Sequence, residues 1–163
     1  MTHDKLVQKA AAWLKRENCG VVFDDRFRGM TTTGEQPDAI GWRHEVSILV
    51  ECKTSRADFL ADRKKPFRVD PTAGMGDWRF MMCPPGLISP EELPEGWGLL
   101  YAHNRKIQKV HGVPTNAQWR SHKPFNGNTT CETQLMYAAL RRMQIRGHLK
   151  AIYEPLNAEV TRS

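Results

Sequence analysis

The chain has 163 residues, which suits a single domain with a hydrophobic core of ordinary size. With 40% hydrophobic and 26% charged residues, the composition excludes a disordered chain, and no apolar run is long enough to span a bilayer. The net charge of +6 favours an anionic partner, and charges interrupt every apolar block at the N-terminus, unlike in a signal peptide. We therefore expect one cytoplasmic domain over residues 1–163, without a membrane partner.

The first part of the chain predicts one helix followed by three strands. Apolar residues recur at helical spacing over residues 4–17. Strands are predicted over 21–27, 37–42 and 46–53, with a tight turn at 43–45 between the last two. The strand at 46–53 carries β-branched apolar residues on both faces, as expected for a central strand that is covered on both sides.

The second part predicts a short helix, a loop, three strands and a final helix. Ser55 can cap a helix over 56–65, and residues 67–77, which contain Gly and Pro, are expected to form a mobile loop. The last helix begins at Thr129, which is spaced from Glu132 as in a capping box. The remaining elements are strands at 78–85, 96–103 and 105–112 and the body of the helix at 129–147. This order is typical of an α/β or α+β fold, a mixed central β-sheet flanked by α-helices.

The four cysteines lie far apart in the sequence and include no CxxC pair. That spacing argues against a zinc ribbon, and thiols in the cytosol are normally reduced. We expect all four to be small buried hydrophobic residues. They are Cys19, Cys52, Cys83 and Cys131.

Positive charge is concentrated in the last third of the chain. Nine Lys or Arg residues and one acid lie between His103 and Lys150, so this stretch carries +8 and the remaining residues carry −2. Such asymmetry favours a nucleic acid as the partner. Trp119, within this basic stretch, is a candidate for stacking on bases.

The stretch from Pro37 to Lys53 contains the candidate catalytic and metal-binding residues. Glu51 and Lys53 point to one side of their strand and Cys52 to the other, because strand side chains alternate. A hairpin through residues 43–45 brings Asp38 beside Glu51. Two carboxylates at strand ends can hold Mg²⁺ or Mn²⁺, with the Cys52 carbonyl as a third ligand. We expect these side chains to face solvent.

Lys53 next to such a metal could orient or deprotonate its water, or neutralise charge on a phosphate. The structural alternative is that Glu51 and Lys53 form only a surface ion pair. Asp58 and Asp62 follow on the next helix, where they are expected to lie on a solvated face.

Pro37-Asp38 followed by Glu51-Cys52-Lys53 resembles the PD-(D/E)XK nuclease superfamily. The resemblance continues through "ECKTSRADFLADRKK", "WRFMMCPPGLI" and "LPEGWGLLYA". In these segments the chain is similar to the MmcB-like DNA-repair branch of the superfamily, which also occurs in phage. It covers about residues 4–110, and the basic C-terminal extension follows.

The resemblance implies a restriction-endonuclease-like core and a divalent-metal-dependent DNA endonuclease of a bacterium or its phage, with RNA as the alternative substrate. Cleavage of both strands with one site per chain would favour a homodimer. Asp38 and Glu51 match the metal ligands, and Lys53 matches the catalytic lysine. A catalytically silent nucleic-acid-binding module or a phage-encoded protein-binding regulator on the same fold is the alternative. The residues expected to contact nucleic acid are Arg26, Arg28, Ser55, Arg56, Arg120, Lys123, Arg141, Arg142 and Arg146.

Overall fold

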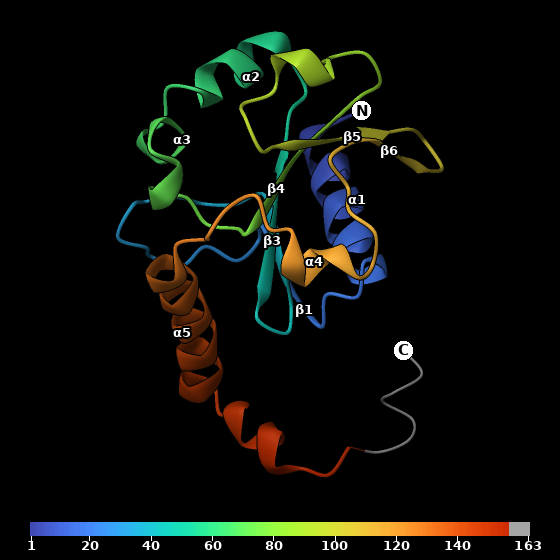
Figure 1. Ribbon diagram of the computed structural model, residues 1–163. Helices are drawn as coiled ribbons and strands as arrows, with labels where there is room; N and C mark the ends of the chain where they lie inside the picture. The colour runs from blue at the N-terminus through green and yellow to red at the C-terminus, as the bar shows by residue number, and fades with distance from the viewer. Residues whose placement is uncertain (157–163) are drawn as a thin grey trace.

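The computed structural model describes residues 1–156 and contains a six-stranded mixed β-sheet flanked by helices (Figure 1). The predicted mixed α/β architecture is therefore confirmed. The helices are α1 (His3–Arg16), α2 (Arg56–Asp62), α3 (Pro66–Val69), α4 (Gln118–Ser121) and α5 (Thr129–Ile145). The strands are β1 (Val21–Asp24), β2 (Ala39–Arg43), β3 (Val46–Cys52), β4 (Trp78–Cys83), β5 (Gly98–Ala102) and β6 (Ile107–His111). Within residues 1–156 there are also three short 3₁₀ helices, η1 (Pro71–Ala73), η2 (Pro90–Glu92) and η3 (Leu149–Tyr153).

The strands follow one another in sequence order across the sheet. β1, β2 and β3 are antiparallel neighbours, β3, β4 and β5 run parallel, and β6 returns antiparallel to β5. All seven residues of β3 are buried. This confirms the prediction for its apolar residues, whereas Glu51 had been expected to face solvent. The parallel run places the carboxyl ends of β3, β4 and β5 on one edge of the sheet.

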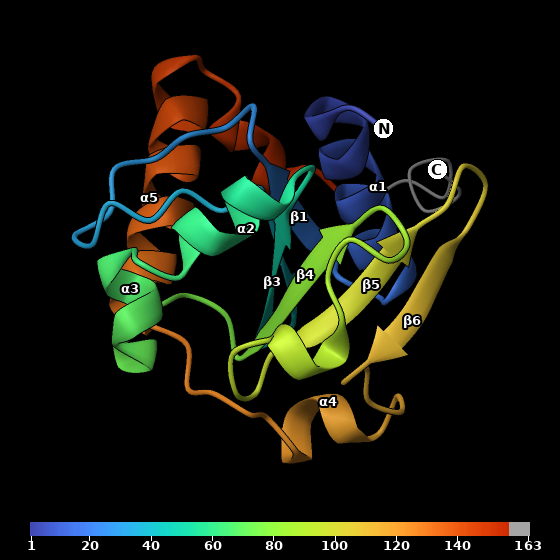
Figure 2. The ribbon, with the colours of Figure 1, turned by 90° about the horizontal axis from the view of Figure 1, so that it is seen from above.

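Two apolar clusters lie on the two faces of the sheet. Figure 2 shows α1 on one side of the sheet and α2 and α5 on the other. Val50 and Cys52 pack on the face that α1 covers, where Leu6 and Trp13 are buried. Leu49 belongs to the other face, towards α2 and α5. The alternation predicted for the end of β3 is thus confirmed.

All four cysteines are free and buried, as expected from their spacing. Trp119, in contrast, was wrongly expected to be exposed for stacking on bases, because only 3% of it is accessible. It packs edge-to-face on Trp78, with 5.1 Å between ring centroids, and its carbonyl accepts a hydrogen bond from Trp78 Nε1 at 2.8 Å. The short helix α4 closes this end of the core.

Residues 67–77 are not the open loop that their Gly and Pro content predicted. They form part of α3 and then η1, and the side chain of Arg79 in β4 donates hydrogen bonds to their backbone. Arg79 is 1% exposed and donates Nη2 to the carbonyls of Pro71 and Gly74, both at 2.9 Å, and Nε to the Gly76 carbonyl at 3.0 Å. One buried guanidinium therefore satisfies three backbone acceptors of this segment.

Helix α5 begins differently from the prediction. Asn128 is its N-cap and accepts a hydrogen bond from the Cys131 N–H at 3.1 Å, so Thr129 is not the cap of a capping box. Glu132 is buried instead and accepts hydrogen bonds from Trp42 Nε1 and the Gly76 N–H. The rest of α5 extends away from the sheet (Figure 1). No helix within residues 1–156 is long and apolar enough to cross a membrane.

Arg79→Met should lower the free energy of unfolding by about 2 kcal/mol or more, because three backbone carbonyls, two of them buried, lose their donor. Arg79→Lys should lose less, since an ammonium group can still reach one acceptor. Urea unfolding of the two variants beside the wild type measures the difference. Equal stability of Arg79→Met and wild type would show that the 67–77 segment does not depend on this side chain.

Candidate functional site

The β2–β3 hairpin brings the predicted site residues together. Ala39 pairs with Val50, and continuing this register by one residue sets Asp38 opposite Glu51. Asp38 Oδ2 accepts a hydrogen bond from the Cys52 N–H at 2.7 Å, which fastens the carboxylate to the end of β3. Lys53 follows directly and donates its N–H to the Met82 carbonyl of the parallel strand β4. We call Asp38, Glu51 and Lys53 the strand-end site.

Burial distinguishes the three residues of this site. Glu51 and Lys53 are each only 3% exposed, so the expectation that they face solvent was wrong. The side chain of Asp38 keeps 17% of its accessible surface and lies at the rim. Lys53 Nζ lies 3.6 Å from Glu51 Oε2, so the ion pair that the alternative interpretation expected exists, but in the interior.

Arg68 of α3 is the partner that the sequence analysis missed. Its side chain is 3% exposed and reaches Glu35 at 2.6 Å, Asp62 at 2.9 Å and Glu51 at 3.1 Å. Nη2, the atom nearest Glu51, has no hydrogen-bond partner of suitable geometry within residues 1–156. Arg68 lies in the segment expected to be a mobile loop, so its sequence position gave no signal of burial.

Asp62 was also misinterpreted, since it is 1% exposed rather than part of a solvated face. It lies at the end of α2 and contacts Lys53 Nζ at 3.2 Å and the half-exposed Lys65 at 2.9 Å. Burial by itself would raise the pKa of Asp62, but Arg68, Lys53 and Lys65 together lower it to about 2. We call Glu35, Glu51, Lys53, Asp62 and Arg68 the buried ion cluster.

Glu51 has the perturbed carboxyl group of this cluster. Burial raises the pKa of Glu51 to about 7, against the favourable field of Arg68 and with a further increase from Asp38. The carboxylates around Lys53 and Arg68 outweigh the effect of burial and raise the pKa of both cations. A proton on Glu51 leaves two carboxylates facing the two buried cations, which balances the charge of the cluster.

Asp38 connects the buried ion cluster with the face that α1 covers. His3, in the first turn of α1, lies with Nε2 3.4 Å from Asp38 Oδ1 and with Nδ1 3.9 Å from Asp25 Oδ2. Neither His3 nor Asp25 was expected at the site, because the hairpin argument concerned only β2 and β3. The rim of the site therefore carries a histidine between two acids.

The donors do not form an open metal centre as they are arranged. Within residues 1–156, no group of three or more His, Cys, Asp or Glu side chains is placed to hold a metal ion. Both oxygens of Glu51 face cations, Arg68 and Lys53, and Asp38 Oδ2 is used by the Cys52 N–H. Mg²⁺ keeps several waters when it binds protein, and a buried Glu51 offers no room for them.

The residues expected to contact nucleic acid do not share one surface. Arg56 follows the carboxyl end of β3, whereas Arg120 contacts Glu45 in the turn before β3 begins. Several are already engaged: Arg26 with Asp24, Arg56 with Glu92, Lys123 with Asp77, Arg142 over the Phe27 ring, and Ser55 as the N-cap of α2. Arg28, Arg141 and Arg146 are exposed and have no ion-pair partner within the described residues.

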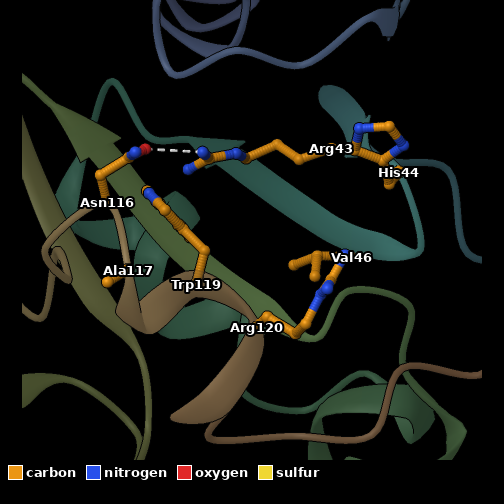
Figure 3. Close-up of a pocket in the computed structure, with 7 residues that line it drawn as sticks. All are labelled: Arg43, His44, Val46, Asn116, Ala117, Trp119 and Arg120. Carbon is orange, nitrogen blue, oxygen red and sulfur yellow. Dashed lines mark hydrogen bonds between the residues drawn. The ribbon is translucent and has the colours of Figure 1, made fainter.

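Trp119 and Arg120 instead line a cavity of about 280 Å³ near the β2–β3 turn (Figure 3). The Arg43 guanidinium donates to Asn116 Oδ1 at 2.7 Å and lies 5.2 Å from the Trp119 ring. Because this turn precedes β3 and the strand-end site follows it, the cavity is at the opposite end of the sheet from Glu51.

No protein-family model matches the chain, and no curated protein matches it either. Among solved structures, the chain is similar to the SPO1766 protein of unknown function from Silicibacter pomeroyi, with a TM-score of 0.59 and 20% sequence identity. The match covers 95% of this chain and 94% of that protein. At this identity the similarity extends to the fold alone.

The raised pKa of Glu51 predicts a pH-dependent stability. In the folded state the pKa of Glu51 is about 7, and in the unfolded state it has the ordinary value of 4.5. The stabilisation is therefore complete below pH 4.5 and is lost as pH rises through 7. Relative to Glu51→Gln, the wild type should lose about 2 kcal/mol of unfolding free energy between pH 5 and pH 8. Urea unfolding at pH 5, 6, 7 and 8 tests this, and a constant difference would contradict it.

Proposed function

We propose that this protein acts on nucleic-acid phosphodiesters, with DNA as the substrate and the strand-end site as the reaction centre. The supporting observation is the β2–β3 register, which sets Asp38 opposite Glu51 and leaves Lys53 next along the strand. Two carboxylates and an amine at the carboxyl end of a central strand suit phosphodiester hydrolysis. The resemblance of Pro37-Asp38 and Glu51-Cys52-Lys53 to PD-(D/E)XK nucleases supports the same function.

The charge states favour one role for Lys53 over another. The neighbouring acids raise its pKa, so Lys53 stays protonated at neutral pH and is suited to stabilising negative charge on a phosphate. A lysine that acted as a base would need a lowered pKa. Asp38, with its partly exposed side chain, is the acid that a substrate reaches first.

A divalent cation, Mg²⁺ or Mn²⁺, stays part of this proposal, with Asp38, Glu51 and the Cys52 carbonyl as its ligands. Binding would require Arg68 to withdraw from Glu51, since its Nη2 lies 3.1 Å from Oε1. Arg68 is carried by the four-residue helix α3, which contributes no buried residue of its own to the core. A displacement of this helix would expose the carboxylate, and it would also separate Arg68 from Glu35 and Asp62.

The second candidate is a catalytically silent nucleic-acid-binding module. The observation that favours it is the closure of the buried ion cluster, in which Lys53 and Arg68 occupy both oxygens of Glu51. In this case the cluster is a structural feature, and nucleic acid binds elsewhere on the surface.

Cleavage of a duplex in the presence of Mg²⁺ or Mn²⁺ tests the first candidate. Asp38→Asn, Glu51→Gln and Lys53→Met should each reduce the rate by about 100-fold or more, because each removes a charge from the reaction centre. These replacements keep the side-chain volume, which matters at two buried positions.

Cys52→Ala is the matched control, since its side chain packs on the face covered by α1 and only its carbonyl lies at the site. It should keep the rate and lose some stability. Circular dichroism and urea unfolding verify that every variant is folded. Duplex binding without cleavage by the wild type, in either metal, would leave only the silent module.

Calorimetric titration with Mn²⁺ tests the role of Arg68. Arg68→Met should bind Mn²⁺ more tightly than the wild type, because the cation that competes for Glu51 is gone. Adding Asp38→Asn to this variant should remove the gain. Arg68→Lys, which retains the charge, serves as the control if Arg68→Met is poorly folded, and it should resemble the wild type. Equal Mn²⁺ affinity in wild type and folded Arg68→Met would contradict the competition.

A further inference from the structure

A groove between α1 and the β5–β6 hairpin is lined by five Lys or Arg side chains. It encloses about 340 Å³, and no acidic residue lines it. Its lining residues are Lys5, Gln8, Lys9, Ala12, Arg16, Arg105, Lys106 and Ile107. We call it the α1–hairpin groove.

The groove is preformed by two elements that are distant in sequence. The opposite side of α1, including Leu6, Ala10 and Trp13, is buried against the sheet, which directs Lys5 and Arg16 outward. The hairpin is held against the helix because Lys9 Nζ donates to the Asn104 carbonyl at 2.9 Å. Ile107 at the foot of the hairpin packs on the same apolar cluster as α1.

Acidic residues near α1 are kept away from this groove. Asp4 lies with Asp24 and Asp25 in a neighbouring hollow, which shares Gln8 with the groove. Glu17, at the C-terminal end of α1, pairs with Lys109 at 2.6 Å. Like charges brought together without counterions repel one another and oppose folding, so the segregation indicates a surface that binds an anionic partner.

The dimensions fit one strand of a nucleic-acid duplex. Lys5 and Arg16 are eleven residues apart in the helix, which corresponds to about 16 Å along its axis. One strand of B-form DNA carries a phosphate every 3.4 Å of axis, so this length faces about five phosphates. The groove offers five cations to them.

The lining also excludes two other modes of binding. No aromatic side chain lines the groove, so it offers no platform for stacking the bases of a single strand. None of the large exposed apolar residues that the structure describes lines it either, so there is no side chain to insert into a lipid surface. The mode of binding that fits this lining is contact with the phosphate backbone of a duplex.

We propose that the α1–hairpin groove binds the phosphate backbone of a nucleic-acid duplex. This inference rests on the proposed function, which makes DNA the substrate. It differs from the earlier expectation because, of the cations in the groove, only Arg105 and Lys106 belong to the basic C-terminal third, and neither was among the residues expected to contact nucleic acid. The groove also starts near the reaction centre. Helix α1 begins at His3, which contacts Asp38, and the hairpin follows the carboxyl end of β5, on the edge of the sheet where β3 ends. A duplex bound there approaches Asp38.

Fluorescence anisotropy with a duplex of about 20 base pairs tests the proposal. The measurement is made in EDTA, which prevents cleavage, over a series of salt concentrations. The combined variant Lys5→Gln, Arg16→Gln and Arg105→Gln should bind roughly tenfold more weakly or worse, and its salt slope should fall by about 2 to 3. Its stability should not decrease, because these side chains are exposed and the change relieves repulsion. Lys9 is retained because it holds the hairpin.

The matched control is Arg28→Gln, Arg141→Gln and Arg146→Gln, which removes the same charge from exposed residues of the originally expected face. It should keep nearly the wild-type affinity and salt slope. Equal losses in the two variants, or a loss confined to this control, would overturn the groove but leave DNA as the substrate.

Failure of the wild type to bind any duplex would instead remove the proposed function, and the groove inference with it. Vesicles containing anionic lipid provide the last comparison. Binding of the wild type to vesicles but not to DNA, lost in the Lys5, Arg16 and Arg105 variant, would assign the groove to a lipid surface and overturn the proposal.

Discussion

The ion pairs of Arg68 are the interaction on which the architecture around the strand-end site depends. One guanidinium contacts acids from three parts of the chain: Glu35 before β2, Glu51 in β3 and Asp62 at the end of α2. A buried charge without a partner is strongly destabilising, so each of these segments is held in place by the others. Helix α3, which has no buried residue of its own in the core, is linked to these segments through this side chain.

The same cluster determines what the site can do. Glu51 sits between Arg68 and Lys53 and has a pKa raised to about 7 by burial, so a proton, the two cations and any metal compete for one carboxylate. Asp38 is outside this competition because it is fastened to the Cys52 N–H and partly exposed. The proposed phosphodiester chemistry and the burial of the ion cluster therefore make opposite demands on Glu51.

The basic groove combines three cations of α1 with Arg105 and Lys106 from the start of the basic C-terminal third. Six of the nine basic or capping residues expected at a nucleic-acid interface have partners within the protein, and α5 carries its arginines away from the sheet. The acids near the start of α1 lie in a neighbouring hollow, and α1 begins where His3 contacts Asp38. This proximity relates the basic groove to the strand-end site more directly than linear charge density does.

The sequence alone determined the features that depend on local spacing. The apolar run of β3, the turn at 43–45, the approach of Asp38 to the end of β3 and the opposite orientation of Cys52 all follow from strand alternation and hairpin geometry. Such patterns repeat over a few residues, so a single segment contains the information.

Only the tertiary structure decided which charged residues are buried. Asp62 on a short helix and Arg68 in a Gly- and Pro-containing segment have the local sequence of exposed residues. They are buried because acids and cations from distant segments compensate one another, and partner choice across such distances leaves no periodic signal. Trp119 was misjudged for the same reason, since its burial depends on Trp78 and not on the basic residues beside it.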